Sequence, residues 1–210
     1  MADDLGAHRH RILPATATNS PIGRALAGVE RLSGLDGLAA TTGRLLAPVL
    51  SGGLGNILRG SWLGHPLHPV LVTVPIGAWT SVPVFDLTGQ PVAAQRLTAV
   101  GLAAAIPAAT AGLAEYTTLD TAQRRVALVH AASNSVAMTA LVGSMAARSR
   151  GLTGRAIALT IAGLGVTAIS GALGGHLTYV QAAGVQRESL PSVSSGTTSI
   201  ATGSHHLDEI

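Results

Sequence analysis

Four apolar stretches that contain no Asp, Glu, Lys or Arg constrain the fold of this chain more than any other feature. They cover residues 69–85, 97–114, 126–147 and 156–175. A helix needs roughly 20 apolar residues, within a range of about 17–25, to cross the hydrocarbon core of a bilayer. Each stretch is therefore long enough to span a membrane, and the sequence predicts four transmembrane helices.

The composition and the linkers favour a membrane bundle over a soluble one. The chain is 47% hydrophobic and only 11% charged, whereas soluble domains carry roughly 25% charged residues. A soluble four-helix bundle would need a polar face on each helix, and the last three stretches show none. Because the linkers are short, neighbouring helices must be antiparallel. The predicted fold class is all-α: an integral membrane antiparallel four-helix bundle with an N-terminal amphipathic helical segment.

Prolines and small residues shape the predicted spans. Pro75, Pro83 and Pro107 lie inside the first two stretches. Membrane helices tolerate proline because neighbouring groups satisfy the carbonyls that it frees, so we expect kinks there. The interiors are rich in Gly, Ala, Ser and Thr, and such residues let helix backbones approach closely in lipid.

The regions on either side of the spans differ in kind from the four-span bundle, which we assign to residues 61–186. Residues 1–60 form a separate N-terminal segment, in which Ile22, Leu26, Val29 and Leu32 share one helical face. This segment either lies on the membrane surface or caps the bundle. Residues 187–210 are rich in Ser, Thr and Gly and are predicted to form a disordered tail.

Several classes of function have no support in the residues. The formal net charge is only +3 and aromatic residues make up 2% of the chain, so no basic, aromatic surface for nucleic acid is expected. The absence of cysteine excludes thiolate metal sites and iron–sulfur ligation within the chain. No Ser–His–acid arrangement or nucleotide fingerprint is present, no catalytic residue is predicted, and whether the protein is an enzyme stays open. The first 20 residues lack the hydrophobic region of a secretory signal.

Histidines between residues 60 and 200 all fall on one side of the predicted bundle. We call this the near side, where the first span begins, and the opposite side the far side. His65 and His68 precede the first span, each directly before a proline, which favours a stiff, extended lead-in. His130 and His176 each lie about 7.5 Å inside their spans at 1.5 Å per residue. Ionisable groups in membrane helices usually face the bundle interior and serve a function.

These histidines support a pocket on the near side and three hypotheses for it. In the first, His130 and His176 are axial ligands of haem b, since they lie at equal depth, and His68 is an alternate ligand or holds a propionate or quinone head group. In the second, imidazoles and one carboxylate bind a divalent metal; the candidate ligands are His65, His68, Glu115, His130 and His176. In the third, the protein is a scaffold or responds to protons through histidine titration.

The motif "LGHPLHPVLVTVPIGAW…FDLTG" resembles a bacterial membrane-protein family catalogued as domain of unknown function 2231. The resemblance continues through "AGLAEY", "VHAASN" and "GGHLTYVQAAGV", over about residues 50–187. It implies a four-helix integral membrane protein. Some relatives carry a fused Rieske iron–sulfur domain, which implies a redox context for them; this chain has no cysteine with which to hold such a cluster.

The expected partners follow from these hypotheses. They are the lipid bilayer, together with a redox protein or a quinone if electrons are transferred; the chain itself is a candidate for homo- or hetero-oligomers. The expected location is the cell inner (plasma) membrane, with several passes. Arginines flank the near and far sides equally, so they do not decide the orientation.

Overall fold

The structure, a computed structural model, describes residues 20–183, and over that range helices are its regular secondary structure, joined by turns and loops. The N-terminal part holds α2 (Pro21–Glu30), a 3₁₀ turn η1 (Ser33–Leu35), α3 (Asp36–Leu50) and α4 (Gly53–Leu58). The bundle consists of α5 (His68–Leu71), α6 (Thr73–Leu87), α7 (Pro91–Tyr116), α8 (Thr121–Arg148), α9 (Thr153–Gly175) and a π-helical turn η2 (His176–Val180). The predicted tail, residues 187–210, lies outside the described residues.

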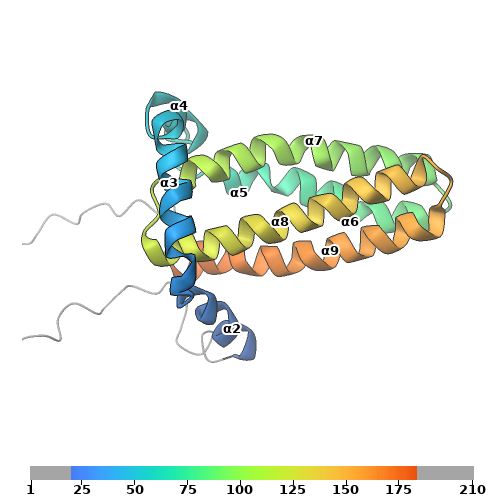
Figure 1. Cartoon of the computed structure of the whole chain (residues 1–210). Helices are drawn as coiled ribbons and strands as arrows, with labels where there is room; N and C mark the ends of the chain where they lie inside the picture. Colours follow the sequence, from blue (N-terminus) through green and yellow to red (C-terminus); the bar gives the residue numbers. More distant parts are fainter. Residues whose placement is uncertain (1–19, 184–210) are drawn as a thin grey trace, which may run out of the picture.

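Four long antiparallel helices run side by side along the bundle (Figure 1). α6 packs along α7, and α8 packs along α9. The helices that are long and apolar enough to cross a membrane cover His68–Leu87, Pro91–Tyr116, Thr121–Arg148 and Thr153–Val180. The predicted all-helical bundle with four membrane-spanning helices is therefore confirmed. Each helix is longer than its charge-free stretch, because polar and charged residues form its first and last turns.

Local sequence explains where these helices begin. Pro69 occupies the first turn of α5, where its missing N–H costs no hydrogen bond. The helix is interrupted at Val72, three residues before Pro75, as expected where proline removes a backbone donor. α8 begins at a capping box: the Asp120 carboxylate accepts from the Gln123 N–H, and the Gln123 side chain accepts from the Asp120 N–H.

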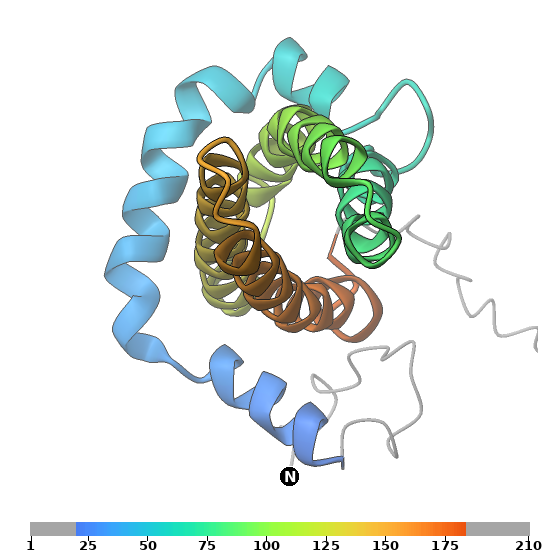
Figure 2. The same ribbon diagram turned by 90° about the vertical axis from the view of Figure 1, so that its right-hand side faces the viewer.

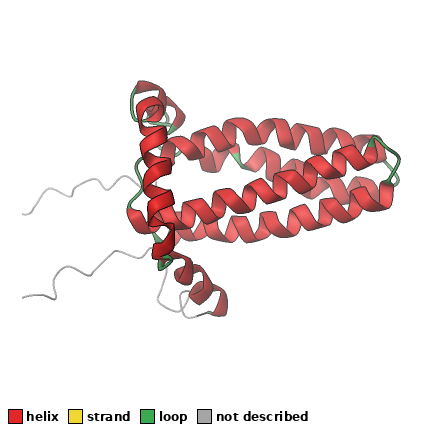
Figure 3. Ribbon diagram, in the orientation of Figure 1, coloured by secondary structure: helices red, strands yellow, loops and turns green. Residues whose placement is uncertain are grey.

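The N-terminal helices form a collar, which we define as α2, η1, α3 and α4. The collar runs across the bundle axis at the near side (Figure 1) and curves around the outside of the bundle (Figure 2). Arg125 of α8 holds it through two bonds to the Asp36 carboxylate, at 2.6 and 2.8 Å. The Tyr116 hydroxyl donates to the Ala39 carbonyl at 3.0 Å. Loops alone connect these helices, and no strand occurs within residues 20–183 (Figure 3).

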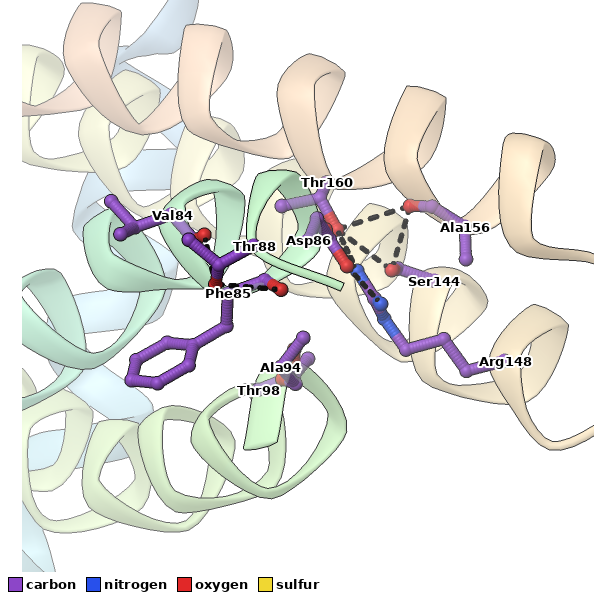
Figure 4. Close-up of polar contacts among 10 residues, drawn as sticks. All are labelled: Val84, Phe85, Asp86, Thr88, Ala94, Thr98, Ser144, Arg148, Ala156 and Thr160. Atoms are coloured by element: carbon purple, nitrogen blue, oxygen red, sulfur yellow. Dashed lines mark hydrogen bonds and ion pairs between the residues drawn. The ribbon is translucent and has the colours of Figure 1, made fainter. Parts of the chain in front are cut away.

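A buried ion pair holds the far side of the bundle together. Arg148, the last residue of α8, binds both carboxylate oxygens of Asp86 near the end of α6. Ser144 and Thr160 lie beside it, and the Ser144 hydroxyl bonds to the Ala156 carbonyl at 2.8 Å (Figure 4). This cluster ties α6, α8 and α9 together at the side opposite the histidines.

Candidate functional site

His68 reaches from the start of the first span to the third-from-last turn of α7. Its Nδ1 lies 2.7 Å from the Ala108 carbonyl oxygen. A carbonyl only accepts, so Nδ1 carries a proton, and Nε2 is the nitrogen that this contact leaves available. His68 is the first residue of α5 and Leu67 before it is also in helical geometry, so the extended backbone predicted for His68 is wrong. The short helix and Pro69 in its first turn position this half-buried imidazole.

His130 lies in the third turn of α8 and is held in the same way by α9. Its Nδ1 lies 2.8 Å from the Ser170 carbonyl oxygen and 3.0 Å from the Ser170 hydroxyl. The proton therefore again resides on Nδ1. The Nε2 lone pair accepts from the Asn134 side-chain amide at 3.1 Å, one helical turn further along α8.

The imidazoles of His68 and His130 lie next to one another in the bundle interior. Their ring centroids are 6.3 Å apart and the ring planes are nearly perpendicular, at 88°. Two glycines give the rings room on the adjacent helices. A Cβ at Gly112 would lie 3.0 Å from His68 Nδ1, and one at Gly174 would lie 3.1 Å from His130 Cε1. The site thus brings together two imidazoles whose orientation is set by backbone carbonyls.

A cavity of about 280 Å³ adjoins the two imidazoles. We call it the histidine cavity. All four spans contribute to it, and its wall is mainly apolar and built from many small residues. Among the larger or polar side chains around it are Trp79, Asn134, Met138, Thr167 and Tyr179.

A second, polar pocket of about 630 Å³ opens on the near side. Arg59, Glu115, Asp120 and Gln181 line it, together with His65. The carboxylate of Glu115 lies within electrostatic range of His68 and Arg59. Its Oε1 is buried and has no hydrogen-bond partner within the part of the chain that the structure describes. Glu115 therefore stands between this polar pocket and His68, not inside the histidine cavity.

The structure does not bring His176 to His130. His176 is buried, and its Nε2 lies 2.6 Å from the Glu30 carboxylate of α2, so it holds the collar. The two histidines do lie on neighbouring helices, but they point in different directions. Ser170 is the α9 residue that faces His130, and six residues further along α9 correspond to a rotation of about 120° away from it. The imidazoles that the structure brings together are those of His68 and His130, not those of the predicted pair His130 and His176.

The predicted five-ligand metal site is not gathered in one place. His65 is exposed, with its Nδ1 3.4 Å from the Pro66 carbonyl oxygen. Within residues 20–183, no three His, Asp or Glu side chains lie close enough to hold one metal ion. Two imidazoles, His68 and His130, therefore remain as the donors that share a cavity.

Sequence reasoning missed the polar residues that organise the two sides of the bundle. Asp86 and Arg148 directly follow the first and third charge-free stretches, where flanking charges would be expected to face water, yet both side chains are almost fully buried. Both residues lie at the far-side ends of their helices and carry opposite charges. That pattern could have predicted the ion pair from the sequence. No comparable signal marks Glu30 and Asp36, because the course of the collar cannot be read from helix order.

Comparison with known proteins bears on the membrane-spanning part. A family model described as "Predicted membrane protein (DUF2231)" matches residues 64–187. The matched region holds both cavity histidines and all four spans, whereas the collar precedes it. No curated protein and no solved structure matches the chain significantly.

Proposed function

This chain belongs to the DUF2231 family of predicted membrane proteins, and we propose that it carries electrons in the inner membrane through a haem b bound by His68 and His130. The observation that carries the proposal is the pair of imidazoles in the bundle interior, 6.3 Å apart between centroids. Metal–imidazole bonds are about 2.0–2.1 Å long, so two of them and the two ring radii together span about 6 Å. The separation thus suits one metal between the rings.

The hydrogen bonds of both histidines support the same proposal. A metal-bound histidine almost always donates its second N–H to a carbonyl or carboxylate, which sets the ring orientation and raises ligand basicity. His68 does this to Ala108 and His130 to Ser170. Binding at His130 requires the Asn134 amide to release Nε2. Haem iron between two imidazoles supplies reversible one-electron transfer.

The cavity size favours a second candidate, a transition-metal ion without a macrocycle. Cavities for drug-sized ligands have volumes of about 300–1,000 Å³, and the histidine cavity has about 280 Å³. Haem would therefore extend beyond it towards the lipid, whereas a single ion would not. Imidazole suits zinc, copper, iron and nickel. A quinone or a redox protein as the electron-exchange partner remains a prediction in either case.

Spectroscopy of the purified protein tests both candidates. Protein from haem-replete cells should show a Soret band that shifts on reduction with dithionite, and His68→Ala or His130→Ala should abolish it. His65→Ala and His176→Ala are matched controls that should retain the band. A colourless protein with one equivalent of a transition metal supports the second candidate. A colourless, metal-free protein overturns both, and loss of the band only in the His176 variant overturns the ligand pair.

A further inference from the structure

The collar carries an apolar surface that the bundle does not cover. Because the four spans cross the membrane and the collar runs across their axis at one end (Figure 1), the collar lies parallel to the membrane plane. It precedes the region that matches the family model, and none of its residues lines the histidine cavity.

One face of α3 packs on the bundle. Ala39, Gly43 and Leu50 are buried there. Gly43 allows close approach, since a Cβ at this position would lie 3.1 Å from the Arg124 guanidinium. Asp36 is on the same face and pairs with Arg125. This face thus contacts the bundle through small residues and an ion pair. The other sides of α3 are not covered by the bundle.

A second face of α3 is apolar and exposed. Leu38, Leu45 and Val49 are 57%, 74% and 63% exposed. At 3.6 residues per turn they form a stripe only about 40° wide, which lies roughly 130° from the bundle-facing side. Arg44 is also exposed but lies about 100–140° from this stripe. α3 therefore places its apolar stripe and its exposed charge, Arg44, on different sides.

The apolar surface continues through the rest of the collar. Ile22 of α2 is 68% exposed, and Leu54 and Ile57 of α4 are 52% and 59% exposed. Trp62, just beyond α4, is 67% exposed, and its indole N–H donates to the Ile57 carbonyl. Tryptophan is enriched where a membrane meets water. α2, α3 and α4 follow one another in an arc around one side of the bundle (Figure 2), so an apolar surface spread along them suits a surrounding solvent better than a single docked protein.

We propose that the collar is a membrane-interfacial arc whose apolar stripe is immersed at the boundary between lipid headgroups and acyl chains. Its binding partner is the lipid bilayer itself. The stripe and Arg44 lie on opposite sides of the bundle-facing side of α3, so one of them points along the spans and the other away from them. Amphipathic helices bind membrane interfaces through their apolar face. Arg44 then points to water, and Leu45 points to lipid.

Site-directed spin labelling can test this orientation because the chain contains no cysteine. Single-cysteine variants Leu45→Cys and Val49→Cys would be labelled and reconstituted in phosphatidylcholine vesicles. Arg44→Cys and Ala40→Cys are controls on the exposed side away from the stripe. Labels at 45 and 49 should collide several-fold more with oxygen than with a water-soluble nickel complex, and labels at 44 and 40 should show the reverse. Circular dichroism of each variant verifies the fold.

The other outcomes overturn the proposal. Equal access of the nickel complex to positions 44 and 45 means that the stripe lies in water. Protection of position 45 from both oxygen and nickel means that a protein, such as a second copy of the chain, covers it. A second measurement uses Trp79→Phe, which leaves Trp62 as the only tryptophan. Brominated lipids should quench its fluorescence, and absence of quenching also contradicts immersion. Neither measurement depends on a bound cofactor, so the proposed function can fail separately.

Discussion

Asp86 and Arg148, which are 62 residues apart in the chain, form a two-pronged ion pair at the far side of the bundle. The two guanidinium nitrogens lie 2.5 and 2.7 Å from the two carboxylate oxygens. The side chain of Asp86 is only 4% exposed and that of Arg148 only 3%. Each charge is therefore stable in this position only with its partner, because removing one leaves the other buried and uncompensated.

The first prediction concerns this ion pair. Arg148→Met should lower the free energy of unfolding by about 3–5 kcal/mol, because Asp86 then stays buried and unpaired. The double variant Asp86→Leu/Arg148→Met should recover most of that loss. Arg150→Met is the matched control, since Arg150 is exposed and surface changes usually stay within about 0.5 kcal/mol. Unfolding in detergent measures all three. Equal losses in the single and the double variant would contradict the assignment.

The second prediction concerns the close approach of α9 to His130. Gly174→Val should lower the affinity of the cavity for the proposed haem or metal ion about tenfold or more, a cost of about 1.4 kcal/mol. The added side chain would push the imidazole away, because even its Cβ lies 3.1 Å from Cε1. Gly165→Val on the same helix has nothing within 4 Å of its Cβ and should bind normally. Cofactor titration monitored by absorbance provides the measurement. Unchanged binding in the Gly174 variant would count against His130 as a ligand.

The third prediction separates His176 from the cavity histidines. His176→Gln should weaken docking of α2, because it removes the 2.6 Å contact with Glu30. Hydrogen bonds to charged groups contribute about 1.5–3 kcal/mol, so trypsin should cleave after the exposed Arg31 at least several-fold faster. Glu30→Gln should act in the same direction. Cofactor content should stay unchanged in both variants. Loss of cofactor without faster cleavage would reverse the role assigned to His176.

The fourth prediction concerns pH. The Arg125 guanidinium, which donates to both carboxylate oxygens, lowers the pKa of Asp36 below its ordinary value of 3.8. A lowered carboxyl pKa means that its contribution to collar docking is complete above about pH 4 and is lost as the pH falls through the folded-state pKa. A spin label at Ala40→Cys should therefore keep constant mobility from pH 7 to about pH 4 and become more mobile below that. With Asp36→Asn added, the label should be mobile throughout. A transition near neutral pH would contradict this origin.

The sequence predicted the spans well because their signal is local. An uninterrupted apolar stretch such as 126–147 needs no knowledge of its neighbours to be recognised as a membrane helix. Antiparallel order then follows from short linkers, and it places His68 and His130 at the same side. The interruption at Val72 was also readable from Pro75. The sequence did not show which apolar residues of the collar pack on the bundle and which stay exposed. Leu26 packs on the bundle and Leu45 is exposed, although both are leucines in helices of the same collar.

The amino-acid sequence by itself determined that this chain crosses the membrane four times and that its imidazoles gather on one side, since hydropathy and helix order act along the chain. Only the tertiary structure decided which imidazoles meet. The depth of a side chain in the membrane depends on how many residues separate it from the end of its helix. The direction in which it points depends on how the helix is rotated about its axis, and packing between helices sets that rotation. That rotation turns His176 to Glu30 and leaves His68 beside His130. For the same reason Asp86 and Arg148, two flanking charges in the sequence, become one buried pair.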